Sequence, residues 1–291
     1  MRTNHTELLA YRMGYTRSAF SVLARIAGAG GRRFSGAVAA LFSEAYCTSQ
    51  PGIIRVVSDN LRLLGHPGGA GAARQVFRNF AETLADYFWL ADKPPGKAFE
   101  LAEIRGPLPA LTSGAILATG HFGFFEFGAL ALSQHGMRVS VVTDAEPSPG
   151  LTGWRADYRR RWGAETIELG QDAFSSLRAA GALSDGRLTA MLVDRPAGER
   201  HLPVALPNGA IPFSMAPAIL SWMTGCPIIP VTVRRTPAHR YLVQTGQPVI
   251  ADRSLPRDEA LAACTRAVAS TLVEDFLCDP LQWYQFVPLQ P

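Results

Sequence analysis

The feature that most constrains the fold is a regular alternation of short apolar runs with helix-like segments in the middle of the chain. The apolar runs, typical of buried strands, cover residues 115–119, 138–143, 166–169 and 187–193. The segments between them, at residues 122–133, 151–162 and 172–183, have helical character. Such alternation is typical of βαβ units around a largely parallel sheet. We therefore predict an α/β fold with a mostly parallel or mixed sheet flanked by helices.

A different pattern precedes this region. Apolar side chains return every three or four positions in residues 53–64 and 76–88, which predicts helices. Residues 18–46 carry apolar side chains among arginines, and as an amphipathic pair they could rest on a bilayer or pack on the core. The linker Lys93-Pro94-Pro95-Gly96 follows. These patterns predict a membrane-facing helical region at 1–100 and an α/β core at 101–291.

The last third of the chain predicts further strands and helices. We expect a strand entering a turn at 204–209, a helix at 214–223, strands at 228–234 and 241–250 joined by a turn, and a final helix beginning near Pro256. The uncharged run 211–233 reaches the ~20 residues that span a bilayer. Prolines and Gly225 interrupt it, so a helix, a turn and a buried strand are favoured over a membrane span. The first seven residues lack the order of a secretory signal, so we expect no cleaved leader.

Composition excludes several classes of protein. The four cysteines form no C-x-x-C pair and lack histidines at metal-ligand spacing, which argues against a disulfide framework or a zinc site and favours a reducing, cytoplasmic location. The formal charge is +4 and the basic residues are nearly all arginine, which binds phosphate bidentately. No zinc-finger, bZIP or RNP pattern is present, so we expect no nucleic-acid partner.

The strongest candidate for chemistry lies where the first apolar run of the α/β region ends. His121 follows that strand, Gly120 and Gly123 flank it, and Glu126 stands five residues on, in the first turns of the next predicted helix. Ligands of open α/β sheets bind at the carboxyl ends of strands. We expect the His121 ring to fold back over the helix start and meet Glu126, leaving one ring nitrogen free as a base. The alternative is a histidine that caps the helix and hydrogen-bonds Glu126 without chemistry.

With these residues the chain resembles the bacterial lipid A biosynthesis acyltransferases of the lysophospholipid acyltransferase superfamily, whose motif is His-x4-Asp/Glu. The resemblance continues through Asp194 and Arg195 at a strand end, through the block 212–218 that contains Phe213, and through the block 224–230. Two departures concern the acceptor: Arg195 stands where the family usually has Gln, and the ending 282–286 lacks a His-Arg-Arg run. The Phe-Pro-Glu-Gly-Thr block of glycerol-phosphate acyltransferases is also absent, which argues against lysophosphatidate as acceptor.

The resemblance implies a reaction and a location. Neutral His121 would deprotonate an acceptor hydroxyl that attacks the thioester of acyl carrier protein or coenzyme A, and Glu126 would stabilise the imidazolium. The acceptor would be a lipid or glycolipid at the cytoplasmic face of the bacterial inner membrane, with the enzyme peripheral or monotopic. The thioester is already activated, so we expect neither a metal nor another cofactor.

Further side chains are expected to bind substrate. The helix containing Arg155, Arg159, Arg160 and Arg161 suits phosphate or anionic headgroups, unless it is simply a solvated charged face. Asp194 could position Arg195 or a hydroxyl, or be an ordinary turn residue. Arg195 or backbone amides near Phe122 and Gly123 could stabilise the oxyanion. Phe122 and its aromatic neighbours could line an acyl tunnel or belong to the core.

Two rival functions remain open from the sequence. The same histidine could act on water in a thioesterase or another hydrolase, although the absence of a Gly-x-Ser-x-Gly elbow argues against a serine hydrolase. A protein that kept the fold could also bind lipids without catalysis. Transfer of the acyl chain that depends on an added acceptor would distinguish an acyltransferase from both of these functions.

Overall fold

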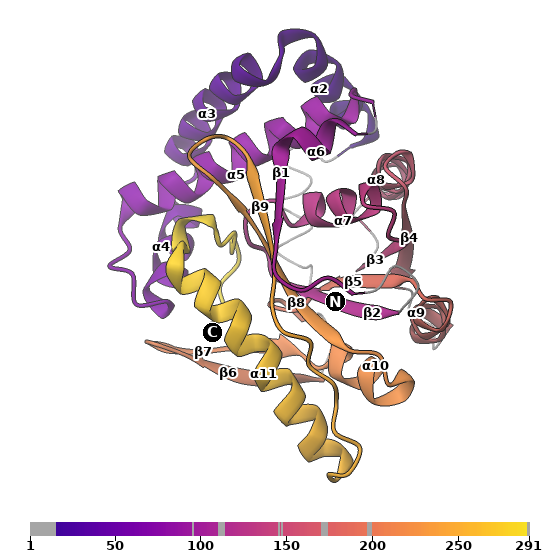
Figure 1. Cartoon of the computed structure of the whole chain (residues 1–291). Coiled ribbons are helices and arrows are strands. Elements are labelled where there is room, and N and C mark those ends of the chain that lie inside the picture. Colours follow the sequence, from indigo (N-terminus) through magenta and orange to yellow (C-terminus); the bar gives the residue numbers. More distant parts are fainter. Residues whose placement is uncertain are drawn as a thin grey trace.

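A seven-stranded mixed sheet forms the centre of the part of the chain that the structure describes. The computed structural model describes residues 16–94, 96–109, 114–144, 146, 148–169, 174–196 and 200–289. The strand order is β1-β9-β8-β2-β5-β3-β4 (Figure 1). The strands are β1 (Ala102–Arg105), β2 (Ala115–Thr119), β3 (Val139–Asp144), β4 (Ala164–Leu169), β5 (Leu188–Leu192), β8 (Ile228–Arg235) and β9 (Tyr241–Thr245). Strands β8, β2, β5, β3 and β4 are parallel, whereas β9 pairs antiparallel with β8 and parallel with β1.

Helices cover both faces of this sheet. On one side lie α7 (Phe125–Gln134) and α8 (Pro149–Arg161), and on the other α9 (Phe174–Ser184), α10 (Ala216–Thr224) and α11 (Arg257–Cys278) (Figure 1). Every residue of β2 is buried, and its side chains alternate between the two faces. Ala115 and Leu117 belong to one apolar cluster, whereas Ile116 and Ala118 belong to the other. A strand covered on both faces explains the uninterrupted apolar run in the sequence.

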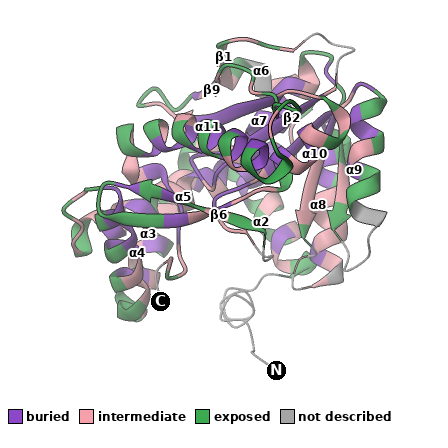
Figure 2. Cartoon of the chain, turned by 90° about the horizontal axis from the view of Figure 1, so that it is seen from below, coloured by how far each residue is buried: buried purple, intermediate pink, exposed green. Residues whose placement is uncertain are grey.

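The N-terminal helices pack against the end of the chain. They are α2 (Arg17–Gly30), α3 (Arg32–Ser49), α4 (Pro51–Leu63) and α5 (Ala70–Ala91), and α6 (Lys97–Leu101) leads into the sheet. The Asn60 amide on α4 donates to the carbonyls of Gln285 and Val287 at 2.9 and 2.8 Å. Tyr284 and Phe286 join the apolar cluster of α3, α4 and α5. Figure 2 shows buried residues concentrated in the sheet and on the helix sides that face it. The outer sides of α3 and α4 are exposed there.

A partly buried ion pair joins the beginning of α3 to α5 and to the sheet. Arg32 donates from Nε and Nη2 to the two carboxylate oxygens of Asp86, each at 2.7 Å. The Tyr241 hydroxyl on β9 donates to the same carboxylate at 2.5 Å. Asp86 is buried, so these bonds replace the water it would otherwise bind. The fold of the helical region is thereby coupled to the sheet.

The predicted class of fold is confirmed, and so are most predicted elements. The four strands and three helices expected between residues 115 and 193 are present, as are the paired strands β8 and β9 and a final helix whose N-cap is Pro256. The run 211–233 forms the end of β7, α10 and the start of β8, as the prolines indicated. Among the described residues, no helix combines the length and the apolarity that crossing a membrane requires.

Several elements differ from expectation. Helix α7 begins at Phe125 rather than Phe122, because Phe122 and Gly123 instead form bridges with Trp283 and Val233. Strand β1 was not predicted. The predicted strand and turn at 204–209 are the first half of a hairpin of β6 (His201–Leu206) with β7 (Gly209–Ser214), and β9 ends at Thr245 rather than Ile250. The N-terminal segment 1–15, where no leader was expected, lies outside the described residues. So do Pro95 of the linker and the predicted helix start at 172–173.

Candidate active site

His121 lies in the short connection between the end of β2 and the start of α7. The flanking glycines are needed because the chain passes very close to other atoms there. A Cβ on Gly120 would collide with the ring of Phe276 and come within 3.1 Å of Asp194 Oδ2. Gly123 has a φ of +54°, and a Cβ on it would collide with the Val233 carbonyl oxygen. The glycines noticed in the sequence therefore allow the histidine loop to sit on the sheet.

Asp194 reaches the same place from the neighbouring strand. Strands β2 and β5 are parallel and in register, with Thr119 opposite Leu192. The pairing continues one step further, since the Val193 amide donates to the Thr119 carbonyl at 2.9 Å. Asp194 follows the end of β5 and thus lies beside His121, at the carboxyl edge where open α/β sheets bind ligands.

The Asp194 carboxylate is fully buried and saturated with donors. Within the described part of the chain it accepts four hydrogen bonds. Oδ1 accepts from His121 Nδ1 at 2.7 Å. Oδ2 accepts from the His121 backbone amide at 2.9 Å, from Trp283 Nε1 at 2.9 Å and from Gln285 Nε2 at 2.7 Å. Burial by itself raises the pKa of Asp194, but the charge and hydrogen bond of His121, the charge of Arg195 and the bond from Trp283 lower that pKa to about 2. Asp194 is therefore ionised at neutral pH.

An ionised Asp194 determines where the imidazole carries its proton. A carboxylate without a proton only accepts hydrogen bonds, so Nδ1 of His121 must be the donor. In the neutral ring the lone pair then lies on Nε2. Nε2 has no hydrogen-bond partner among the residues that the structure describes, and the side chain is 19% exposed. This arrangement leaves Nε2 able to accept a proton from a group within hydrogen-bond distance.

The carboxylate paired with His121 is thus Asp194, and the expected pairing with Glu126 is wrong. Glu126 lies on the first turn of α7 and bonds the guanidinium of Arg159 on α8, at 3.1 Å through Nε and 2.5 Å through Nη2. Glu126 and Arg159 have side chains only 9% and 3% exposed. Burial opposes ionisation of Glu126, yet Arg159 and Arg155 lower its pKa below the usual value. A bidentate partner of opposite charge on the facing helix was a better match for Glu126 than the loop histidine.

The basic helix predicted to bind headgroups is divided between interior and surface. Arg159 faces inward to Glu126 and Thr166, and Arg155 pairs with Glu146 at 2.8 Å. Arg160 is exposed and pairs with Asp157 on its own helix. The rings of Tyr87 and Tyr158 lie beside the Glu126 pair, tilted by 35° to each other with centroids 4.3 Å apart. On this helix the aromatic side chains belong to the core rather than to a headgroup surface.

The candidate oxyanion donors are already engaged. The amides of Phe122 and Gly123 donate to the carbonyls of Gly120 and Gln282 at 2.7 and 2.8 Å. Arg195 donates from Nε and Nη2 to Gln285 Oε1 at 3.1 and 3.0 Å, and from Nη2 to the Tyr284 carbonyl at 3.1 Å. The structure therefore places Arg195 against the end of the chain.

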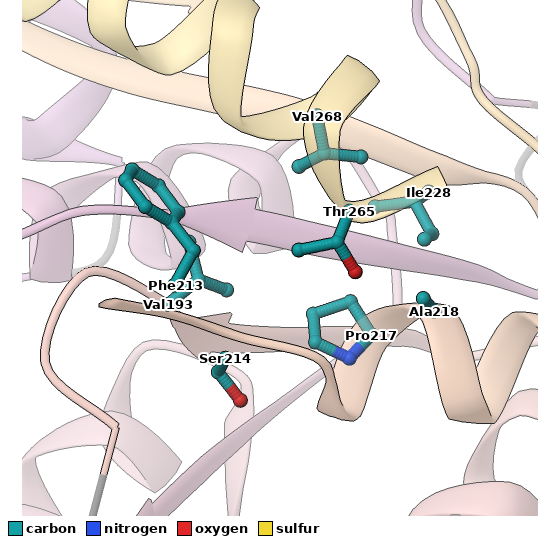
Figure 3. A pocket seen from close by; sticks show the side chains of 8 residues that line it. All are labelled: Val193, Phe213, Ser214, Pro217, Ala218, Ile228, Thr265 and Val268. Atoms are coloured by element: carbon teal, nitrogen blue, oxygen red, sulfur yellow. The ribbon is translucent and has the colours of Figure 1, made fainter. Parts of the chain in front are cut away.

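The candidate aromatic residues lie in the core. Phe122 is fully buried and stacks on Phe276, whereas Phe125 is the ring beside His121, with centroids 5.6 Å apart. Phe213 lines a cavity of about 10 Å³ between α10 and α11 (Figure 3). A cavity of that size has room for about one water molecule. It does not hold an acyl chain in this conformation.

Sequence reasoning missed two site residues, Trp283 and Gln285. Both are 1% exposed and both donate to Asp194. A buried indole needs a hydrogen-bond acceptor for its N–H, so Trp283 near the end of the chain indicated that a buried acceptor lies close to it. Nothing in the sequence indicated which acceptor it would find. Among the described residues, no cluster of His, Cys, Asp and Glu side chains could hold a metal ion.

Comparison with known families bears on the same region. A family model described as bacterial lipid A biosynthesis acyltransferase matches residues 107–289, which is more than half of the chain. The matched segment contains His121, Glu126 and Asp194. A comparison with curated proteins found no match.

Proposed function

The chain belongs to the bacterial lipid A biosynthesis acyltransferase family and is an acyltransferase, and we propose that it moves a fatty acyl chain from a thioester to a lipid hydroxyl. The donor is acyl carrier protein or coenzyme A, and the acceptor is a lipid or glycolipid. One observation supports this reaction above all others. The hydrogen bond between His121 Nδ1 and the buried Asp194 leaves Nε2 as the ring nitrogen that can act as a base, in a side chain that is 19% exposed.

The proposed reaction begins with proton removal. His121 Nε2 takes the proton of the acceptor hydroxyl as its oxygen attacks the thioester carbonyl, forming the new C–O bond. The imidazolium is stabilised by Asp194, which holds a full negative charge next to Nδ1. The C–S bond then breaks, and the departing sulfur recovers the proton from His121. The side chains return to their starting protonation states without any further reactant.

Glu126 and Arg159 have a supporting part in this proposal. Their ion pair joins the first turn of α7 to α8, immediately after the loop that carries His121. A buried bidentate pair restrains both helices, because neither charge can leave its partner without water to replace it. We propose that the pair holds the histidine loop in place and makes no contact with the substrate.

The decisive test is acceptor dependence. The purified protein is given a thioester of acyl carrier protein or coenzyme A whose acyl chain is labelled. We expect it to form labelled lipid only when a hydroxyl-bearing acceptor such as a lipid A precursor is added. The reason is that, in the proposed reaction, His121 removes a proton from an alcohol bound beside it, so no transfer occurs without that alcohol. Chromatography of the labelled products measures this. Release of free fatty acid at one rate, with or without acceptor, would establish a hydrolase instead.

We further propose that α2 and α3 lie on the cytoplasmic surface of the inner membrane. Val22, Leu23 and Ile26 are exposed on one side of α2, and Phe34, Leu41 and Phe42 are exposed on α3. Arg25 and Arg33 are exposed among them. Apolar side chains flanked by arginines suit the boundary between acyl chains and anionic headgroups. A lipid acceptor could then reach the enzyme without leaving the bilayer.

Sedimentation with vesicles tests this location. We expect the protein to sediment with vesicles containing anionic phospholipid at low salt, and Leu41→Ser/Phe42→Ser to weaken binding roughly 10²- to 10⁴-fold, since each of the two buried apolar side chains contributes about 1.5–3 kcal/mol. Both side chains are 71% exposed, so the fold should tolerate the change. The matched control is Leu177→Ser/Ile250→Ser, two exposed apolar residues outside these helices. Equal binding by both double variants would contradict the proposal.

A further inference from the structure

Gln285 connects the catalytic carboxylate to an arginine. Its side chain is buried, with only 1% of the residue exposed. Nε2 donates to Asp194 Oδ2 at 2.7 Å, while Oε1 accepts from Arg195 Nε and Nη2 at 3.1 and 3.0 Å. Arg195 follows Asp194 directly in the chain, so the two partners of Gln285 are consecutive residues. The amide therefore sits between a carboxylate and a guanidinium.

The chemistry of the two neighbours permits only one orientation of this amide. A guanidinium has donors and no acceptor, so it requires the oxygen of Gln285. An ionised carboxylate has acceptors and no donor, so it requires the nitrogen. Rotating the amide by half a turn would place oxygen against oxygen and N–H against N–H. Arg195 thus directs the N–H donors of Gln285 toward Asp194.

The consequence for His121 follows from the geometry of the carboxylate. Oδ2 of Asp194 is held by Trp283, Gln285 and the His121 amide, and Oδ1 is left for the imidazole. The donors on Oδ2 fix the rotation of the carboxylate and therefore the direction in which Oδ1 meets Nδ1. The Tyr284 amide also donates to the His121 carbonyl at 2.7 Å, which docks this part of the chain on the histidine loop.

We propose that Gln285 is a positioning residue, oriented by Arg195, that fixes Asp194 and through it the His121 base. This inference rests on the proposed function, because it assigns Gln285 and Arg195 a part in the same reaction. It also gives Arg195 a different role from a direct contact with substrate. The two residues act as one unit, and neither touches the reacting atoms.

The first test is Gln285→Glu, which keeps the shape of the side chain. An ionised glutamate, which the Arg195 guanidinium favours, still accepts from Arg195 but cannot donate to Asp194, and it adds a negative charge there. We expect kcat to fall roughly 10- to 100-fold, the effect of losing a hydrogen bond to a charged group, with KM for the donor changed less than about twofold. The negative charge added beside Asp194 should also change how kcat depends on pH, so the pH profile of the variant should differ from that of the wild type. Unchanged kcat and pH profile would overturn the proposal.

The matched control for this variant is Gln247→Glu. Gln247 is exposed and lies near Val249, which pairs with Ile228 at the opposite end of the sheet from His121. The same change of charge there should leave kcat, KM and the pH profile as they are. A thermal melt of both variants reports whether the end of the chain remains docked.

The second test is a double-mutant cycle of Arg195→Ala and Gln285→Ala. If Arg195 acts by orienting Gln285, its loss should lower kcat about tenfold in the wild-type background and less than about twofold once Gln285 is alanine. If Arg195 contacts the substrate, the two losses should multiply, which would overturn the proposal. The cycle remains informative where Gln285→Glu fails to fold.

A spectroscopic measurement separates this inference from the proposed function. The ¹⁵N shifts of labelled histidine report which nitrogen of His121 carries the proton, with His121→Ala identifying the signal. We expect protonation at Nδ1 in the wild type and a changed tautomer ratio or titration in Gln285→Glu and Arg195→Ala. Those shifts would support the positioning role even if no acyl transfer were detected. Identical spectra in all variants would refute it while leaving acyl transfer to its own assay.

Discussion

His121→Ala and Asp194→Asn should each lower kcat by about 10²–10⁴-fold, the contribution of a well-placed general base. Alanine removes the base. Asparagine removes the charge that stabilises the imidazolium and presents a neutral amide to donors that all require an acceptor. An amide N–H facing Nδ1 would favour the tautomer with its proton on Nε2, where no base remains. Steady-state acyl transfer at saturating donor measures both losses.

Matched substitutions show whether these losses belong to the site. His135→Ala removes an exposed histidine that follows α7, and Asp258→Asn changes an exposed carboxylate in the first turn of α11. Neither should change kcat by more than about twofold, as expected for surface substitutions that leave the fold intact. Wild-type kcat in either site variant would remove His121 and Asp194 from the reaction.

Glu126→Ala should destabilise the protein strongly. It leaves the Arg159 guanidinium, which is 3% exposed, buried without its bidentate carboxylate. Removing one partner of a buried ion pair costs about 3–5 kcal/mol of unfolding free energy. For a chain of this size that corresponds to a fall in melting temperature of roughly 6–15 °C. Differential scanning calorimetry at neutral pH measures it.

Two comparisons show whether this loss arises from the buried pair. Glu103→Ala breaks a contact with Arg105 in which both side chains are about half exposed or more, and should cost at most about 1 kcal/mol. Replacing both partners, as Glu126→Leu/Arg159→Met, should recover much of the stability because no charge is left buried. A Glu126→Ala protein that melts like the wild type yet has the low kcat of His121→Ala would show that Glu126 acts in the chemistry.

Local pattern was enough for most of the sheet and for the loop at its edge. The apolar runs of β2 and β5 are continuous because helices cover both faces of the sheet, and a few consecutive residues are enough to recognise such a run. Gly120 and Gly123 marked the histidine loop, since only glycine tolerates the close contacts there. The start of α7 was placed too early, because bridges from Phe122 to Trp283 and from Gly123 to Val233 depend on distant residues.

The partner of His121 could not be obtained in the same way. Glu126 is five residues from His121 in sequence, whereas Asp194 is 73 residues away and Gln285 is 91 residues from Asp194. Glu126 and Asp194 both carry a carboxylate that can accept from an imidazole, so the shorter separation along the chain favoured Glu126 as the partner of His121. The structure pairs Glu126 with Arg159, from which it is separated by 33 residues.

Local sequence pattern was sufficient to predict the α/β class, the strand that ends at Thr119 and the position of His121 at the carboxyl edge of the sheet. These follow from hydrophobic periodicity and glycine sterics, which act over a few neighbouring residues. The folded arrangement of distant segments was needed to show which carboxylate faces the imidazole and which side chains hold that carboxylate. Parallel register brings Asp194 beside His121, and the end of the chain adds Trp283 and Gln285. Such pairings depend on strand order and long-range packing, which short-range pattern does not encode.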